Sequence, residues 1–191
     1  MTFYRHDPDM ESKLKDLVYR FEKEGRPNLN QNISINWIRY ETLKPETGSG
    51  IGAEWQSNKL VYPASIVKIF YAVATEAWLQ KDLLIESNEI RRALYEMIQN
   101  SNNDATSYII DVLTATTSGP SLTGNQKICW EKQRQLINLW LMSLNWEELK
   151  GVNCNQKTWN EGPYGREKDF YGINNNNRNR LTTSATARLL E

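Results

Sequence analysis

The chain has 191 residues, with 23 basic and 23 acidic side chains and no net charge. Its length predicts a single domain over residues 1–191, and seven Trp, nine Tyr and four Phe can supply its core. The balanced charge gives no electrostatic case for a nucleic-acid partner or an anionic membrane. No apolar stretch is long enough to span a bilayer and no leader is visible. The sequence as given therefore predicts a cytoplasmic protein.

The first third of the chain has the patterns of one helix and one β-hairpin. Residues 10–24 place a row of apolar side chains on one helical face: Leu14, Leu17, Val18 and Phe21. Residues 33–41 alternate, with Ile33, Ile35 and Trp37 on one side, which predicts a strand. Residues 44–50 are typical of a turn, and residues 51–56 are expected to form the returning strand.

Four further helices are expected in the middle of the chain. Pro63 suits a helix start, and the following residues 64–80 are apolar nearly all round, as in a buried helix. Apolar residues at helical spacing predict further helices over 88–100, 104–113 and 130–144.

The last forty or so residues begin as a loop and end as a helix. Residues 150–180 are rich in Gly and Asn, which predicts an irregular segment. Residues 181–190 then form a helix with a Thr or Ser N-cap. Together the elements predict an α+β fold, with helices packed on a small antiparallel sheet.

Ser65 and Lys68 form a Ser-x-x-Lys motif in the first turn of the expected buried helix. At i, i+3 the two side chains share one helical face and can touch. Desolvation and the positive end of the helix both favour a lowered lysine pKa, so a neutral amine can take the proton of the Ser65 hydroxyl. The ordinary structural alternative is an N-cap serine followed by a lysine that extends to solvent.

The tripeptide Ser101-Asn102-Asn103 lies where two of the expected helices meet. Its ordinary structural role is a helix stop and an N-cap, which Ser and Asn commonly fill. The chain has one histidine, His6, in an N-terminal stretch that is expected to be solvated. A serine nucleophile in this chain is therefore expected to use Lys68 rather than a histidine as its base.

The two cysteines give no framework for a disulfide or a metal. Cys129 and Cys154 are too few and too isolated for a disulfide scaffold or a zinc site, and both are expected to be buried thiols. No metal and no organic cofactor is implied.

Taken in order, these motifs resemble the class A β-lactamases and penicillin-binding proteins. The segment around Ser65 and Lys68 resembles their nucleophile helix, and Ser101-Asn102-Asn103 resembles their Ser-Asp-Asn motif. Residues 181–190 look like the helix that follows the omega loop in class A enzymes. The resemblance spans about residues 30–191 and implies a β-lactamase/transpeptidase-like fold.

What the resemblance implies is acyl transfer to a serine. Ser65 would attack the carbonyl of a β-lactam or a peptidoglycan-like amide, with Lys68 as base or proton relay. Ser101 would pass a proton to the leaving nitrogen, and Asn103 would bind the amide side chain of the substrate. The backbone N–H of Ser65 would form half of the oxyanion hole. The family usually works outside the cytoplasm.

The chain departs from the family pattern in three places. Ser65 and Ser101 are closer together than in class A enzymes, which implies a trimmed helical region. The deacylating glutamate has no clear counterpart: Glu161 and Glu167 are candidates, and the ordinary alternative is a solvated loop charge. No Lys-Thr-Gly motif follows residue 181, and the Lys44–Gly48 stretch is in the wrong place.

Because that motif lies on a central strand in the family, the sheet is expected to be incomplete at its C-terminal part. An open sheet edge would call for a partner or a missing segment to cover it. The sequence therefore predicts a class A β-lactamase-like serine hydrolase acting on a small or peptide-like substrate. The alternatives are a non-catalytic binding or scaffold descendant, an inactive fragment, and a plain helical interaction protein.

Overall fold

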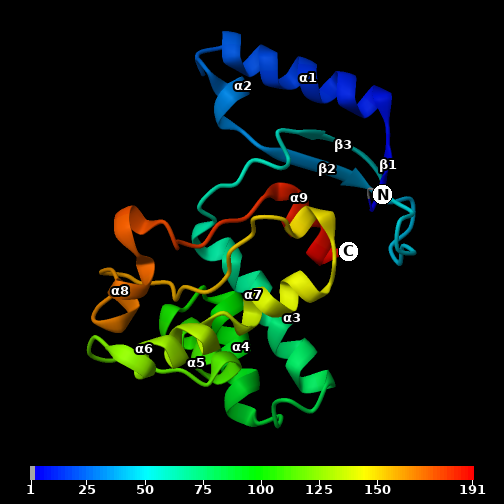
Figure 1. The fold of residues 1–191 in the computed structure, drawn as a ribbon. Helices are drawn as coiled ribbons and strands as arrows, with labels where there is room; N and C mark the ends of the chain where they lie inside the picture. The colour runs from blue at the N-terminus through cyan, green and yellow to red at the C-terminus, as the bar shows by residue number, and fades with distance from the viewer. Residues whose placement is uncertain (1–2) are drawn as a thin grey trace. The chain divides into compact units, whose positions relative to one another are not determined.

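The structure is a computed structural model that describes residues 3–191, and the chain divides into two compact units (Figure 1). Unit 1 holds the chain up to Leu60 together with Thr182–Glu191, and unit 2 is Val61–Leu181. Backbone hydrogen bonds of 2.9 and 3.0 Å join Val61 and Leu181, so both ends of unit 2 meet. Within unit 1, the Ser184 N–H donates to the Ser57 carbonyl at 3.1 Å.

Unit 1 is an α+β unit built on a three-stranded sheet. Its elements are β1 (Arg5–His6), α1 (Pro8–Lys23), α2 (Leu29–Asn32), β2 (Ile35–Arg39), β3 (Ile51–Trp55) and α9 (Thr183–Leu190). The strand order is β1-β3-β2, with β2 antiparallel and β1 parallel to β3. The predicted helix and hairpin are confirmed, but the sheet is mixed rather than antiparallel, because the short strand at His6 pairs with the far edge of β3.

The core of unit 1 lies between α1 and the sheet. Three side chains spaced four residues apart on α1 are buried against Ala53: Met10, Leu14 and Val18. The prediction that Leu17 and Phe21 share this buried face is wrong, since they are 41% and 37% exposed. The buried row of residues at i, i+4 and i+8 covers only a narrow face of the helix, so Leu17 and Phe21 lie at the edges of that face. Trp37 is likewise 41% exposed and lies outside this core.

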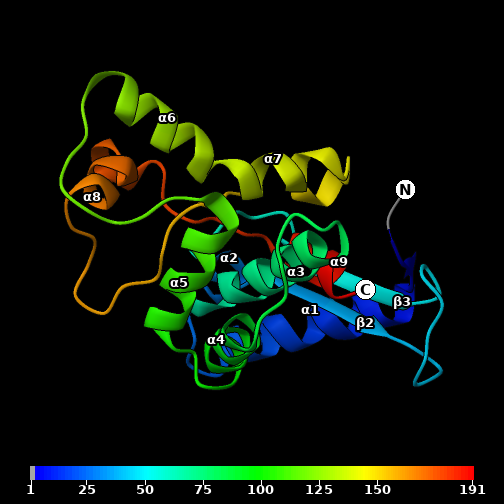
Figure 2. The same cartoon turned by 90° about the horizontal axis from the view of Figure 1, so that it is seen from below.

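Unit 2 is helical along most of its length (Figure 2). Its elements are η1 (Ala64–Ile66), α3 (Val67–Gln80), α4 (Asn88–Gln99), α5 (Asn103–Thr114), α6 (Gly124–Arg134), α7 (Leu136–Ser143), η2 (Glu147–Leu149), α8 (Arg166–Tyr171) and η3 (Ile173–Asn175). Helix α3 packs against α4 and α5, and α5 packs against α7. The fully buried side chains of this core include Phe70, Tyr71, Ile109, Ile110 and Ile137.

The predicted helices at α3, α4 and α5 are confirmed, but the prediction of one helix over 130–144 is wrong. A helix runs from Gly124 to Arg134, and a second one begins at Leu136. The backbone of Gln135 (φ −84°, ψ −3°) lies between them, away from the helical ψ. No Gly or Pro marks this break in the sequence.

The segment 153–158 is buried, although the sequence predicts a loop there. The side chain of Asn179 holds it: its Oδ1 accepts from the N–H groups of Asn155 and Gln156, at 3.1 and 3.0 Å. Its Nδ2 donates to the Tyr71 hydroxyl on α3 and to the Gln156 carbonyl, at 3.1 and 2.9 Å. Backbone groups that would otherwise be unpaired in the interior are therefore satisfied, and the segment is fixed against α3.

The two cysteines have different surroundings. Cys154 is buried, as expected, whereas the prediction of a buried thiol at Cys129 is wrong because this side chain lies exposed on α6. Over the part of the chain that the structure describes, no helix is both long and apolar enough to cross a membrane.

Candidate functional site

Ser65 lies exposed on η1, immediately before α3. Its hydroxyl does not cap a helix: the N-cap residues of η1 and α3 are Pro63 and Ile66, and neither makes a side-chain capping bond. The preceding residue, Ala64, has φ +47°, in the left-handed region that residues with a Cβ rarely adopt. Strained backbone of this kind concentrates at functional sites.

Lys68, the second residue of α3, is buried and 2% exposed, so it does not extend to solvent. Its Nζ donates to the Ser101 carbonyl at 2.5 Å and to the Ser101 Oγ at 3.0 Å. A third bond reaches the Asn103 Oδ1 at 2.8 Å. Burial lowers the pKa of Lys68, because it disfavours the charged ammonium. The structure thus brings together three of the four predicted site residues.

The fourth, Ser65, is not bonded to this group. All three bonds of the Lys68 amine go to Ser101 and Asn103, and none goes to the Ser65 hydroxyl one turn earlier. An ammonium has three N–H donors, so these three acceptors saturate it. A neutral amine has a lone pair instead, and among the three acceptors only the Ser101 hydroxyl can turn round and donate to it. The geometry of this contact therefore permits a proton to pass between Lys68 and Ser101.

Ser101 and Asn102 place these groups at the start of α5. Ser101 has φ +50°, a second left-handed residue in the site. The Asn102 Oδ1 accepts from the Ala105 N–H at 2.9 Å, so Asn102 is the N-cap of α5. The capping role that the sequence offers as the ordinary alternative is real for Asn102, and it fixes the two flanking residues beside Lys68.

Two site residues that the sequence analysis missed surround Asn103. The Thr158 hydroxyl donates to the Asn103 Oδ1 at 2.8 Å, and the Asn103 Nδ2 donates to the Asn160 Oδ1 at 2.6 Å. Both partners come from the end of the buried segment that begins at residue 153. The one signal in the sequence was the absence of Gly and Pro over residues 152–161, inside an otherwise Gly-rich stretch.

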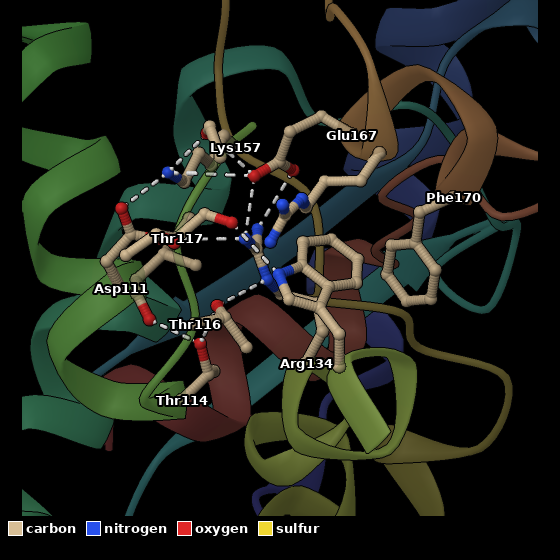
Figure 3. Close-up of polar contacts among 12 residues, drawn as sticks. Asp111, Thr114, Thr116, Thr117, Arg134, Lys157, Glu167 and Phe170 are labelled. Atoms are coloured by element: carbon tan, nitrogen blue, oxygen red, sulfur yellow. Dashed lines mark hydrogen bonds and ion pairs between the residues drawn. The ribbon is translucent and has the colours of Figure 1, made fainter. Parts of the chain in front are cut away.

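An ion cluster of four residues, of which only Asp111 is partly exposed, anchors this segment (Figure 3): Asp111, Arg134, Lys157 and Glu167. The Arg134 guanidinium donates two bonds to the Glu167 carboxylate, at 2.7 and 3.1 Å, and both side chains are 0% exposed. The Lys157 Nζ lies 2.7 Å from the Asp111 carboxylate and 3.6 Å from that of Glu167. Burial raises the pKa of Asp111, although Lys157 and Arg134 oppose the shift. Lys157 directly precedes Thr158 in the chain, so its ion pairs help to fix the position of Thr158 beside Asn103.

The two candidate glutamates have different positions. Both oxygens of Glu167 are engaged by Arg134, and Oε1 also accepts from the Ser118 hydroxyl at 2.9 Å. Glu167 is 0% exposed and ion-paired, so it is not a solvated loop charge, and its carboxylate has no access to a solvent water that it could activate as a general base. Glu161 is exposed and follows Asn160 directly, and it stays a candidate.

Thr158→Val is expected to lower the free energy of unfolding by about 1 kcal/mol, because Asn103 loses a buried hydrogen-bond donor. Urea titration followed by tryptophan fluorescence measures this change. Thr158→Ser keeps the hydroxyl and is the control, expected to stay near the wild type. A loss in Thr158→Ser as large as that in Thr158→Val would contradict the assignment to the hydrogen bond, because serine keeps the hydroxyl that donates to Asn103.

No family model, curated protein or solved structure matches this chain. The site itself consists of an exposed serine beside strained backbone, and a buried lysine bonded to a serine and an asparagine.

Proposed function

We propose that this chain is a class A β-lactamase-like serine hydrolase, with a fold of the β-lactamase/transpeptidase type. The main support for this proposal is the environment of Lys68. Lys68 is buried without a carboxylate partner among the described residues, and its bonds go to Ser101 and Asn103, the second motif of the sequence pattern. A buried lysine that is bonded only to neutral groups is suited to proton transfer. No carboxylate in the described part of the chain stabilises the charged ammonium form of Lys68, so the neutral amine becomes accessible.

The reaction proceeds through an acyl-enzyme. The Ser65 Oγ forms a bond to the carbonyl carbon of a lactam or amide, and its proton passes to the neutral amine of Lys68, which turns from its bonds with Ser101 and Asn103 to accept it. The backbone N–H of Ser65 stabilises the oxyanion. The C–N bond then breaks, and the leaving nitrogen takes a proton from the Ser101 hydroxyl, which Lys68 replenishes. The amide of Asn103 orients the acyl side chain of the substrate.

Hydrolysis of the acyl-enzyme is the slow step in this proposal. It needs a base that activates a water, and Glu167 is fully engaged by Arg134 and Ser118. Glu161 is the remaining candidate, and its side chain is exposed to solvent. The adduct on Ser65 is therefore expected to outlast the mixing time of an ordinary labelling experiment.

The test is intact-mass spectrometry after incubation with a fluorescent penicillin, beside a colour assay with nitrocefin. The wild type is expected to gain the mass of one penicillin, and Ser65→Ala is expected to gain none. Ser12→Ala, an exposed serine of α1, is the control and should label like the wild type. Nitrocefin turnover without an adduct would show fast deacylation, and Glu161→Gln should then trap the adduct.

An absent adduct in a folded wild-type chain, together with absent turnover, would contradict the proposal. The chain would then be a binding or scaffold domain that has the motifs without the chemistry. Far-UV circular dichroism on the same samples establishes that the chain is folded.

A further inference from the structure

Unit 2 contains a cavity beside the candidate site, with a volume of about 490 Å³. Its lining includes Tyr62, Trp159, Asn160, Lys168, Tyr171 and Arg178. This volume falls in the range of pockets that bind small molecules, which is roughly 300–1,000 Å³. The lining therefore combines three aromatic side chains with two positively charged ones.

The cavity is cationic, and its charge is not balanced locally. No carboxylate lines it. Over residues 3–191, neither Arg178 nor Lys168 has an Asp or Glu oxygen within 4.0 Å, whereas the buried Arg134 and Lys157 both have one. The Arg178 guanidinium instead stacks on the Tyr62 ring, with Cζ 3.6 Å from the ring centroid. A stacked guanidinium keeps its edge N–H groups available for an anion.

Two donors on the lining residues are buried without a hydrogen-bond partner in the described part of the chain: the Arg178 Nε and the Trp159 Nε1. A buried, unpaired donor is costly, at roughly 1–3 kcal/mol each and more for a charged group. Nearly all such groups in folded proteins are satisfied, so two unpaired donors on residues that line one cavity point to a missing acceptor. Both atoms have almost no accessible surface, so a ligand oxygen would reach them only after a small shift of the Arg178 and Trp159 side chains.

The cavity adjoins the hydrogen-bonded group around Lys68. Asn160 lines the cavity, and its Oδ1 accepts the bond from the Asn103 Nδ2 at 2.6 Å. On the other side, Tyr62 lies three residues before Ser65 on the same stretch of chain. A molecule in the cavity would therefore extend from the segment that leads into η1 and Ser65 to Asn160, which contacts Asn103.

We infer that this cavity binds a carboxylate-bearing aromatic group, with the carboxylate at Arg178 and Lys168 and the ring among Tyr62, Trp159 and Tyr171. Its use as the subsite for the acyl side chain of a substrate rests on the proposed function, whereas binding of the anion does not. The substrate class would then be an acyl donor with an anionic aromatic side chain. A neutral side chain would leave the guanidinium without its acceptor.

Binding is tested without any acylation, by NMR of the indole N–H groups of ¹⁵N-labelled tryptophan. The cross-peak of Trp159, identified by its loss in Trp159→Phe, is expected to shift on titration with phenylacetate. Its neutral analogue phenylacetamide should bind about tenfold more weakly, since a charged hydrogen bond is worth about 1.5–3 kcal/mol. Arg178→Gln should weaken phenylacetate about tenfold. Arg180→Gln, an exposed neighbour outside the cavity lining, is the control and should change nothing.

The subsite is tested with two penicillins that differ by one carboxylate on the side chain, carbenicillin and benzylpenicillin. In the wild type the ratio of their acylation rates should favour carbenicillin, and in Arg178→Gln this ratio should fall about tenfold. An unchanged ratio with labelling intact would overturn the subsite alone. Absent labelling with both drugs would contradict the proposed function and leave the phenylacetate result to decide on the cavity. Equal binding of phenylacetate and phenylacetamide would overturn the inference.

Discussion

Lys68→Met is expected to slow the acylation of Ser65 about 10²- to 10⁴-fold, the usual contribution of a general base. Methionine fills the buried space of the lysine stem but cannot accept a proton or bond to Ser101 and Asn103. The rate of adduct formation with a fluorescent penicillin, followed by intact mass, measures the loss. Lys81→Met, at the exposed C-cap of the same helix, is the matched control and should label at the wild-type rate.

The pH dependence distinguishes a base from a structural lysine. Burial lowers the pKa of Lys68, so the neutral amine is populated at a lower pH than for an ordinary lysine. The wild-type acylation rate should therefore rise with pH through one ionisation below the usual lysine range. Lys68→Arg stays protonated at all accessible pH values and should be slow throughout. A wild-type profile that is flat, with Lys68→Met as fast as the wild type, would contradict a role in proton transfer.

Arg134→Met is expected to lower the free energy of unfolding by about 3–5 kcal/mol, because the fully buried Glu167 carboxylate loses both hydrogen bonds from the guanidinium and keeps only Lys157, 3.6 Å away, as a cationic neighbour. The variant also loses the contact of the guanidinium with the Trp130 ring, 4.5 Å from its centroid. Urea titration followed by far-UV circular dichroism measures the change. A loss of this size is a large part of the stability of an ordinary domain.

Two further variants separate charge from packing. Arg92→Met removes an exposed arginine paired with Glu89 on the surface of α4, and no measurable change is expected. Arg134→Met combined with Glu167→Gln removes both buried charges and should recover much of the loss, since an unpaired charge no longer remains. A double variant as unstable as Arg134→Met would attribute the effect to packing around Trp130.

The helices were predictable because their apolar residues repeat at helical spacing, as at Ile90, Leu94 and Met97 of α4. The segment 153–158 was not, because polar residues rarely fill an interior without specific partners. Its burial depends on Asn179, whose hydrogen bonds reach back 23 and 24 residues along the chain. Hydrogen bonds at that distance between an uncharged side chain and backbone N–H groups leave no periodic signal in the sequence.

The site residues likewise divide into those on periodic helices, which were predictable, and those on the segment without periodicity, which were not. The approach of Lys68 to Ser101 and Asn103 follows from two short motifs at the ends of helices that pack together. Thr158 and Asn160 come from the segment that has no periodicity, and they could not be placed. Glu167 was expected at the surface because its partner, Arg134, is 33 positions away and lies near a helix break that no Gly or Pro marks.

The paired ends of unit 2 make it an insertion within unit 1. The chain leaves unit 1 after Leu60 and returns at Thr182, and unit 1 is thus assembled from two stretches separated by the whole of unit 2. If unit 2 is unfolded, bringing these stretches together means closing a long, flexible loop, at an entropic cost of about 4 kcal/mol. If unit 2 folds first, the bonds between Val61 and Leu181 close that loop in advance. The topology therefore favours an order of assembly in which unit 2 folds first, and we expect the last helix, α9, to dock onto unit 1 after it.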